Sequence, residues 1–184
     1  MKNRKIDKSK VKKKPMGKIL CGLCQEVMAT LKEESVDLTV TSPPYDNIRD
    51  YKGYCFEEAD FKEIVKQLYR ITKKGGVVVW VVGDATMKGS ETGTSFRQAL
   101  GFIEGGFKLH DTMIYEKNTS SFPAQRKGKR YTQIFEYMFV FCKGKIKTGN
   151  LICDKANKWA GHTNWGKNTQ RGKNGELKKT KDIK

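Results

Sequence analysis

The sequence lacks any apolar run close to the roughly 20 residues that a membrane-spanning helix needs. Its N-terminus is a lysine-rich run with no apolar segment behind it, unlike a secretory signal. Cysteine is sparse, and the five residues are an odd number with irregular spacing, which argues against a disulfide framework and for reduced thiols. We therefore expect a cytoplasmic protein that makes no membrane contact.

Histidine is scarce as well, with two residues in the whole chain. Cys21 and Cys24 form a CxxC pair, but no second pair and no pair of histidines stand at the spacing of zinc ligands. We therefore expect no metal site and interpret the two cysteines as half-buried thiols beside a strand.

Charge, by contrast, is abundant and uneven, with a formal net charge of +17. Residues 1–18 contain nine basic residues and one acidic residue. Residues 19–116 contain 11 basic and 15 acidic residues, and residues 117–184 contain 17 basic and four acidic residues. A mildly acidic middle between two basic flanks is typical of a protein that docks on a polyanion through phosphate contacts. For the first 14 residues a solubilising tail is the alternative.

The hydrophobic pattern predicts one folded domain over 18–145, preceded by a disordered basic arm over 1–17 and followed by a basic segment over 146–184. The expected strands are 19–21, 36–40, 77–82, 109–116 and 136–142, and the expected helices are 60–72, 94–104 and a short one through Val27, Met28 and Leu31. Six consecutive apolar residues over 77–82 indicate a strand covered on both faces, which predicts an α/β fold with a doubly wound sheet.

The strongest chemical signal is the segment Thr41-Ser42-Pro43-Pro44-Tyr45, at the carboxyl end of an expected buried strand. Two prolines fix the backbone and donate no hydrogen bond, so the turn is stiff and its carbonyl groups point outward. One hydroxyl with one or two carbonyl oxygens suits a target that presents an NH₂ group. Tyr45 adds an aromatic face that can stack on a base rotated out of a duplex. The alternative is a plain proline turn with a half-buried loop tyrosine.

Several segments resemble one known family, the amino-methyltransferases of DNA in their permuted (beta) group, in which the catalytic motif precedes the cofactor motif. The matching segments are 37–45, 68–76, the strand that ends at Gly83-Asp84, and 130–136 with its strand. The resemblance covers roughly residues 18–166. It implies a Rossmann-like, doubly wound, mostly parallel sheet of the S-adenosylmethionine-dependent methyltransferase fold, with double-stranded DNA as the substrate.

The resemblance also implies roles for the motif residues Ser42, Pro43, Pro44 and Tyr45. The Ser42 Oγ and the Pro43 carbonyl would hold the amine hydrogens, so that the nitrogen attacks the sulfonium methyl of S-adenosyl-L-methionine directly. In the family a serine at the first motif position usually accompanies methylation of cytosine at N4. An aspartate at that position usually accompanies methylation of adenine at N6. We therefore expect N4-cytosine, with N6-adenine as the alternative. No Pro-Cys dipeptide is present, which excludes the thiolate chemistry of ring-carbon methylation.

Further candidates surround the motif. The candidate cofactor residues are Thr41, Asp84 and Gly22, although an N-cap or turn role suits Asp84 equally well. The candidate DNA-binding residues are Arg49, Tyr51, Arg126, Lys127, Lys129 and Arg130, for which solvated polar loops are the alternative. Residues 146–184 would begin a target-recognition region or form a basic tail.

One element of the resembled family is missing from the sequence. No glycine-rich turn of the Asp-Pro-Phe-x-Gly-x-Gly type follows the catalytic strand, and Gly22-Leu23 stands where the family commonly has Gly-Asp. We therefore expect the cofactor half to lie on a complementing chain or a missing C-terminal piece. The alternative is a non-catalytic module that binds DNA through its basic flanks.

Overall fold

The computed structural model describes residues 17–45, 56–118, 129, 131, 133–150 and 169–179. By its internal packing the chain divides into two compact units, Met1–Thr148 and Gly149–Lys184. The first unit contains a four-stranded sheet in the order β1 (Val36–Thr41), β2 (Thr72–Val82), β6 (Phe135–Cys142) and β5 (Lys108–Glu116). Its helices are α1 (Cys24–Ala29), α2 (Glu58–Ile71) and α3 (Thr94–Glu104).

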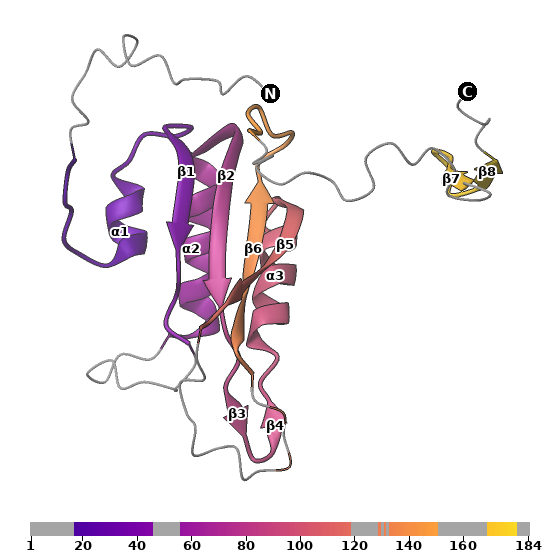
Figure 1. Cartoon of the computed structure of the whole chain (residues 1–184). Coiled ribbons are helices and arrows are strands. Elements are labelled where there is room, and N and C mark those ends of the chain that lie inside the picture. Colours follow the sequence, from indigo (N-terminus) through magenta and orange to yellow (C-terminus); the bar gives the residue numbers. More distant parts are fainter. Residues whose placement is uncertain are drawn as a thin grey trace. The chain divides into compact units, whose positions relative to one another are not determined.

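The strand pairings give a mixed sheet. β1 runs parallel to β2, whereas β6 runs antiparallel to both β2 and β5. Figure 1 shows α2 and α3 on one face of this sheet. The expected α/β fold is confirmed, although among the described residues these two helices cover one face rather than both.

Helix α2 follows its predicted amphipathic pattern, and the residues expected on one face are all buried: Phe61, Ile64, Val65, Leu68 and Ile71. Its start differs from the prediction. The apolar spacing predicts a helix over 60–72, but the N-cap is Glu57, and Asp60 accepts a hydrogen bond from the Glu57 backbone N–H at 3.3 Å within a reciprocal capping box. Helix α2 therefore begins two residues earlier than the apolar spacing alone indicates.

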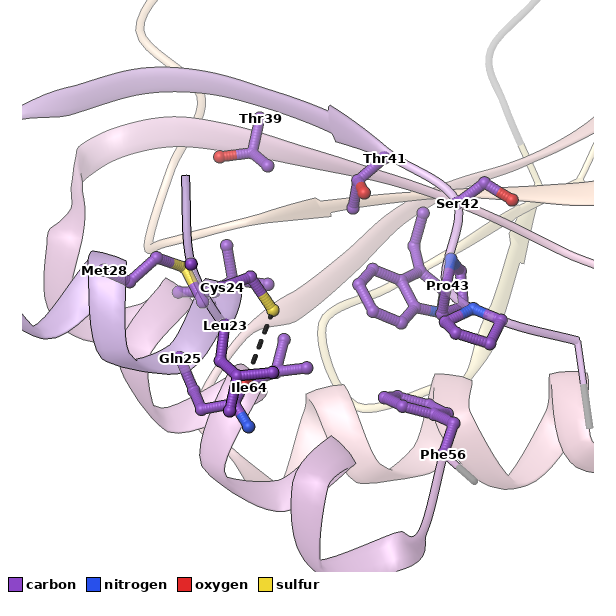
Figure 2. A pocket seen from close by; sticks show the side chains of 14 residues that line it. Leu23, Cys24, Gln25, Met28, Thr39, Thr41, Ser42, Pro43, Phe56 and Ile64 are labelled. Carbon is purple, nitrogen blue, oxygen red and sulfur yellow. Dashed lines mark hydrogen bonds between the residues drawn. The ribbon is translucent and has the colours of Figure 1, made fainter. Parts of the chain in front are cut away.

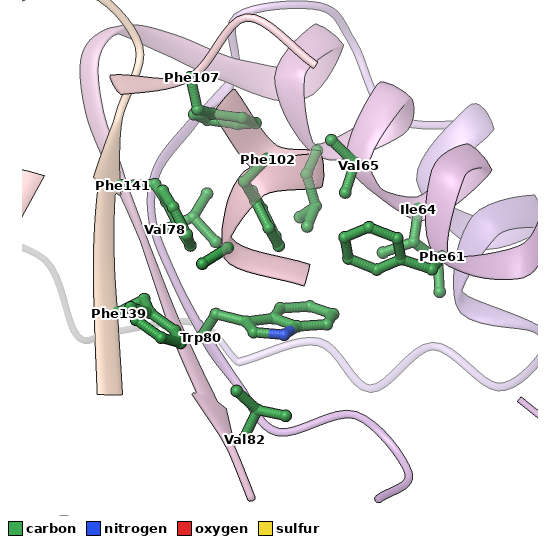
Figure 3. Close-up of a cluster of buried hydrophobic side chains, with 12 residues drawn as sticks. Phe61, Ile64, Val65, Val78, Trp80, Val82, Phe102, Phe107, Phe139 and Phe141 are labelled. Carbon is green, nitrogen blue, oxygen red and sulfur yellow. The ribbon is translucent and has the colours of Figure 1, made fainter. Parts of the chain in front are cut away.

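The core lies between the sheet and these two helices and is rich in aromatic rings (Figure 3). The Phe102 ring from α3 is fully buried and stacks on Phe141 of β6, with ring centroids 4.3 Å apart. Trp80 of β2 contacts Phe102 edge-on at 5.0 Å, and its Nε1 donates a buried hydrogen bond of 2.8 Å to Gln98 Oε1. The polar end of the indole is thus satisfied inside the core.

Two sequence-based predictions about the N-terminal part of the fold are wrong. Residues 19–21 form no strand, because no neighbouring strand among the described residues pairs with them, and Ile19 is almost completely exposed. The strand at 36–40 was expected to be buried, but β1 is an edge strand. Leu38 and Val40 are 58% and 64% exposed, since no described element covers that face of β1.

Small hairpins complete the described structure. β3 (Thr86–Met87) pairs with β4 (Ser90–Glu91) across a turn in which Lys88 and Gly89 both have positive φ, as a two-residue I′ turn requires. In the second unit, β7 (Thr169–Arg171) pairs with β8 (Leu177–Lys179). Within the described ranges, no helix combines the length and the apolar character needed to span a membrane.

Candidate active site

Strand β1 delivers the Thr41-Ser42-Pro43-Pro44-Tyr45 segment to the carboxyl-terminal edge of the sheet. β1 ends at Thr41, and the next four residues leave the strand without regular structure. Pro43 is buried, whereas Ser42 is exposed. The stiff turn therefore anchors itself in the protein through one proline and presents the serine hydroxyl to solvent.

A chain of hydrogen bonds links Ser42, which follows β1, to Glu136 of β6, two strands away in the sheet. Ser42 Oγ donates to the Tyr45 hydroxyl at 2.7 Å, and that hydroxyl donates to Glu136 Oε2 at 3.0 Å. The other carboxylate oxygen of Glu136 forms a 2.5 Å ion pair with Lys117 Nζ. Glu136 is the second residue of β6, and its side chain is only 15% exposed, so this carboxylate is held firmly beside the motif loop.

The carboxylate sets the direction of these hydrogen bonds. An ionised Glu136 can only accept, so the Tyr45 hydroxyl must give it its single proton. The Tyr45 oxygen can then only accept, and Ser42 must donate to it. The lone pairs of Ser42 Oγ consequently remain available for an incoming donor such as an NH₂ group. This arrangement is compatible with the acceptor role that the family resemblance implies for Ser42, which stays a prediction.

Sequence reasoning did not single out Glu136 or Lys117 as site residues. Tyr45 and Glu136 are 91 positions apart, and no local motif marks the pair. The only available signal was that both segments belonged to the family resemblance. Gly83, directly after β2, lies next to this contact, since a Cβ there would be in ordinary van der Waals contact with the Tyr45 ring at 3.8 Å and with Glu136 Cγ at 3.7 Å.

An apolar pocket of about 370 Å³ lies directly beside the motif, between β1, α1 and α2 (Figure 2). Met28 lies at one end of it, and Pro43 and Phe56 at the other. The hydroxyl-bearing residues of its lining are Thr39, Thr41 and Ser42. No Asp or Glu is among the described residues that line it. The pocket can therefore accept an apolar group together with one or two polar atoms.

The structure brings two of the three candidate cofactor residues to this pocket. Gly22 and Thr41 line it, and Asp84 does not. Asp84 instead accepts hydrogen bonds from the Ser95 backbone N–H at 2.9 Å, from the Ser95 hydroxyl and from the Thr92 hydroxyl at 3.4 Å. These contacts hold the start of α3 and match the turn role considered as the alternative.

Of the candidate DNA-binding residues, only Lys129 falls within the described residues, where it is exposed. The others, Arg49, Tyr51, Arg126, Lys127 and Arg130, lie outside them. Cys24 lines the pocket, and desolvation raises the pKa of its thiol, so it stays protonated at neutral pH. Across the described ranges no cluster of three metal-ligating side chains occurs.

Known proteins resemble this chain in sequence and in fold. A family model described as DNA methylase (N6_N4_Mtase) matches residues 36–183. The orphan methyltransferase M.BamHII of Bacillus amyloliquefaciens is 66% identical over 125 residues, which are 68% of this chain and 45% of that protein. The matched segment is thus less than half of the relative.

Two solved structures show the same fold. The PvuII DNA methyltransferase (cytosine-N4-specific) is 22% identical with a TM-score of 0.52, over 66% of this chain and 47% of that one. A Thermus thermophilus protein described as a DNA modification methylase, solved in complex with S-adenosyl-L-methionine, is 24% identical with a TM-score of 0.52, over 69% and 55%. With the family model covering most of the sequence, this chain belongs to the N6/N4 family of DNA methylases.

Proposed function

We propose that this chain carries the base-activating half of a cytoplasmic DNA methyltransferase that methylates the exocyclic N4 of cytosine. The observation that carries the proposal is the hydrogen-bond chain from Ser42 through Tyr45 to Glu136, which leaves the serine lone pairs free at an exposed sheet edge. The amine of a nucleobase is a poor nucleophile because its lone pair is conjugated with the ring. Acceptors that hold its hydrogens favour the tetrahedral geometry in which the nitrogen can attack.

Each motif residue has a role in this proposal. Ser42 Oγ and the Pro43 carbonyl accept the two amine hydrogens, and the Tyr45 ring stacks on the flipped base. Tyr45 is held from behind by Glu136, so the ring and the serine are fixed relative to each other before the base arrives. Positioning and a preorganised electrostatic environment then supply most of the rate enhancement.

S-adenosyl-L-methionine is the proposed methyl donor. It supplies an electrophilic methyl group. The pocket beside the motif fits one side of such a molecule, because its lining is mostly apolar and Thr39 and Thr41 offer hydroxyls. It offers no carboxylate among its described lining residues for the ribose hydroxyls. The chain therefore presents half of a cofactor site, in keeping with the missing glycine-rich turn and with the relative that continues beyond the matched segment.

The proposed activity can be tested with the full chain, the remaining part of the Bacillus amyloliquefaciens relative, labelled S-adenosyl-L-methionine and mixed-sequence DNA. We expect label in the DNA and N4-methylcytosine on nucleoside analysis. Recovery of N6-methyladenine instead would select the alternative substrate, since the family includes both chemistries. If no label appears although the complementing part is present and bound, the result would contradict the transferase proposal and favour a DNA-binding module without transferase activity.

Replacing Glu136 by glutamine should reduce the turnover number in this assay about 10- to 100-fold, the equivalent of one charge-assisted hydrogen bond. The amide can donate to Tyr45 as well as accept from it, so the direction of the chain is no longer fixed. We expect an unchanged KM for DNA and a somewhat lower melting temperature, because the new side chain keeps the same shape but loses the charge that pairs with Lys117. Glu116→Gln is the matched control, since Glu116 is exposed on the neighbouring strand β5. Equal turnover of both variants would contradict the role of Glu136.

A further inference from the structure

One wall of the pocket is formed by helix α1, which has little of its own to hold it in place. The helix contains six residues, none of them buried, and no side chain caps its start. A helix this short is unstable in water by itself. Cys24, Gln25 and Met28 of α1 nevertheless line the pocket, across from the threonines of β1 (Figure 2). The shape of this wall therefore depends on the contacts that fix α1 to the rest of the fold.

Arg70, in the last turn of α2, makes the strongest of these contacts. Its Nη1 donates to the Leu31 carbonyl at 2.9 Å, and its Nη2 donates to the Met28 carbonyl at 2.7 Å. Carbonyl groups at the end of a helix lack helical partners, and a cation beside them is favourable. The Nε of Arg70 donates to Gln67 Oε1 at 2.9 Å, which fixes the plane of the guanidinium. Arg70 thus joins the carboxyl end of α1 to α2 through two charge-assisted hydrogen bonds.

Two further contacts of α1 are weaker. Gln25 Nε2 lies 3.5 Å from Asp60 Oδ1, at the limit of a hydrogen bond, and Met28 is only partly buried against the core. Arg70 itself is not among the described residues that line the pocket. Its side chain can therefore affect a molecule in the pocket through the position of α1 and not by direct contact.

We propose that Arg70 is a positioning residue for the cofactor, because its guanidinium fixes α1 where the pocket has the shape that binds S-adenosyl-L-methionine. The inference rests on the proposed function, in which this pocket is one side of the cofactor site. The hydrogen bonds from Ser42 through Tyr45 to Glu136 involve neither α1 nor Arg70. Loss of the guanidinium should consequently weaken binding of the methyl donor equally in the ground state and in the transition state, which raises KM and leaves the turnover number unchanged.

The test compares Arg70→Met with wild type in the full chain, mixed with the remaining part of the Bacillus amyloliquefaciens relative. Calorimetry should show S-adenosyl-L-methionine binding about 10- to 100-fold more weakly to the variant, because two charge-assisted hydrogen bonds are lost. The KM for the donor should rise by a similar factor. The turnover number at saturating donor and the KM for DNA should stay within about threefold of wild type. Arg70→Lys keeps the charge without the planar fork and should give an intermediate affinity.

Hydrogen exchange of the backbone amides tests the position of α1 in the absence of any cofactor. In Arg70→Met the amides of residues 24–31 should exchange faster, while those of β2 stay protected in the core. Arg97→Met is the matched control, because Arg97 also donates to a backbone carbonyl, that of Thr92 at 2.7 Å. Arg97 lies on α3, from which no described residue lines the pocket. This control should leave both the exchange of α1 and the affinity for the donor unchanged.

The outcomes separate the role of Arg70 from the activity. Faster exchange in α1 with an unchanged affinity for S-adenosyl-L-methionine would overturn the proposal, because Arg70 would then stabilise a surface helix and nothing more. Unchanged exchange in α1, or a wild-type complex that binds no donor, would overturn it as well. If Arg70→Met does not fold, the same comparison of exchange and affinity in Arg70→Lys decides. A wild-type complex that binds the donor through Arg70 but transfers no methyl group would support the role of Arg70 and contradict the proposed function.

Discussion

Ser42→Ala should lower methyl transfer by the complemented enzyme about 10²- to 10³-fold, the loss that follows removal of one preorganised hydrogen-bonding group in a transition state. The alanine cannot accept an amine hydrogen, so the nucleobase nitrogen stays conjugated with its ring. DNA affinity should change little, because it depends mainly on phosphate contacts and not on this hydroxyl. Turnover measured with saturating DNA, alongside a salt titration of DNA binding, checks both expectations.

A matched control for this variant lies at the other end of the same strand. Ser35 immediately precedes β1, is exposed, and donates a 2.6 Å hydrogen bond to the Lys32 carbonyl. Ser35→Ala removes the same atoms far from the motif and should retain full turnover. Tyr45→Ala should reproduce the loss caused by Ser42→Ala, because it removes both the stacking ring and the link to Glu136. Full activity in both motif variants would show that the site lies elsewhere.

Phe102→Ala should destabilise the first unit by about 3–5 kcal/mol, a large share of the roughly 5–15 kcal/mol that stabilises a typical domain. Phe102 is fully buried, stacks on Phe141 and meets Phe61, Trp80 and Phe107 at its other sides. Its removal leaves a cavity where the sheet meets both helices. Urea denaturation followed by tryptophan fluorescence should show a much lower midpoint, or no folded baseline at all.

Phe96 provides the comparison for this stability measurement. It lies on the same helix but is 52% exposed, and its one described ring contact is with Tyr137 at 5.2 Å. Phe96→Ala should therefore shift stability by no more than about 1.5 kcal/mol, the upper value for an aromatic pair. Similar midpoints for the two variants would mean that the packing around Phe102 does not dominate the core.

Local sequence patterns predicted the elements that position the site, and the reasons are physical. The apolar spacing of α2 and the apolar run within β2 each reflect burial along one element, so both were visible in the sequence. The motif at the end of β1 was also predictable, because parallel strands place functional residues at their carboxyl ends. Its hydrogen-bond partner Glu136 was not, since that contact depends on β6 lying next to β2.

Two other features differ from the sequence-based prediction. The residues of β1 alternate between apolar and polar, which signals a half-exposed strand, but the alternation was outweighed by the overall apolar content. In the basic C-terminal segment no element was expected, although Asn174-Gly175 is a strong hairpin turn signal and Gly175 has φ +80° between β7 and β8. Both signals were short and were weighed too lightly.

The chain from Ser42 through Tyr45 to Glu136 consists wholly of residues from this one polypeptide. It can form as soon as the polypeptide folds, whether or not a methyl donor is within reach. If the methyl donor is bound by a second component, the amount of that component limits how much DNA is methylated. The residues that bind the base would already be in position, and the synthesis of the other component would determine when DNA is methylated.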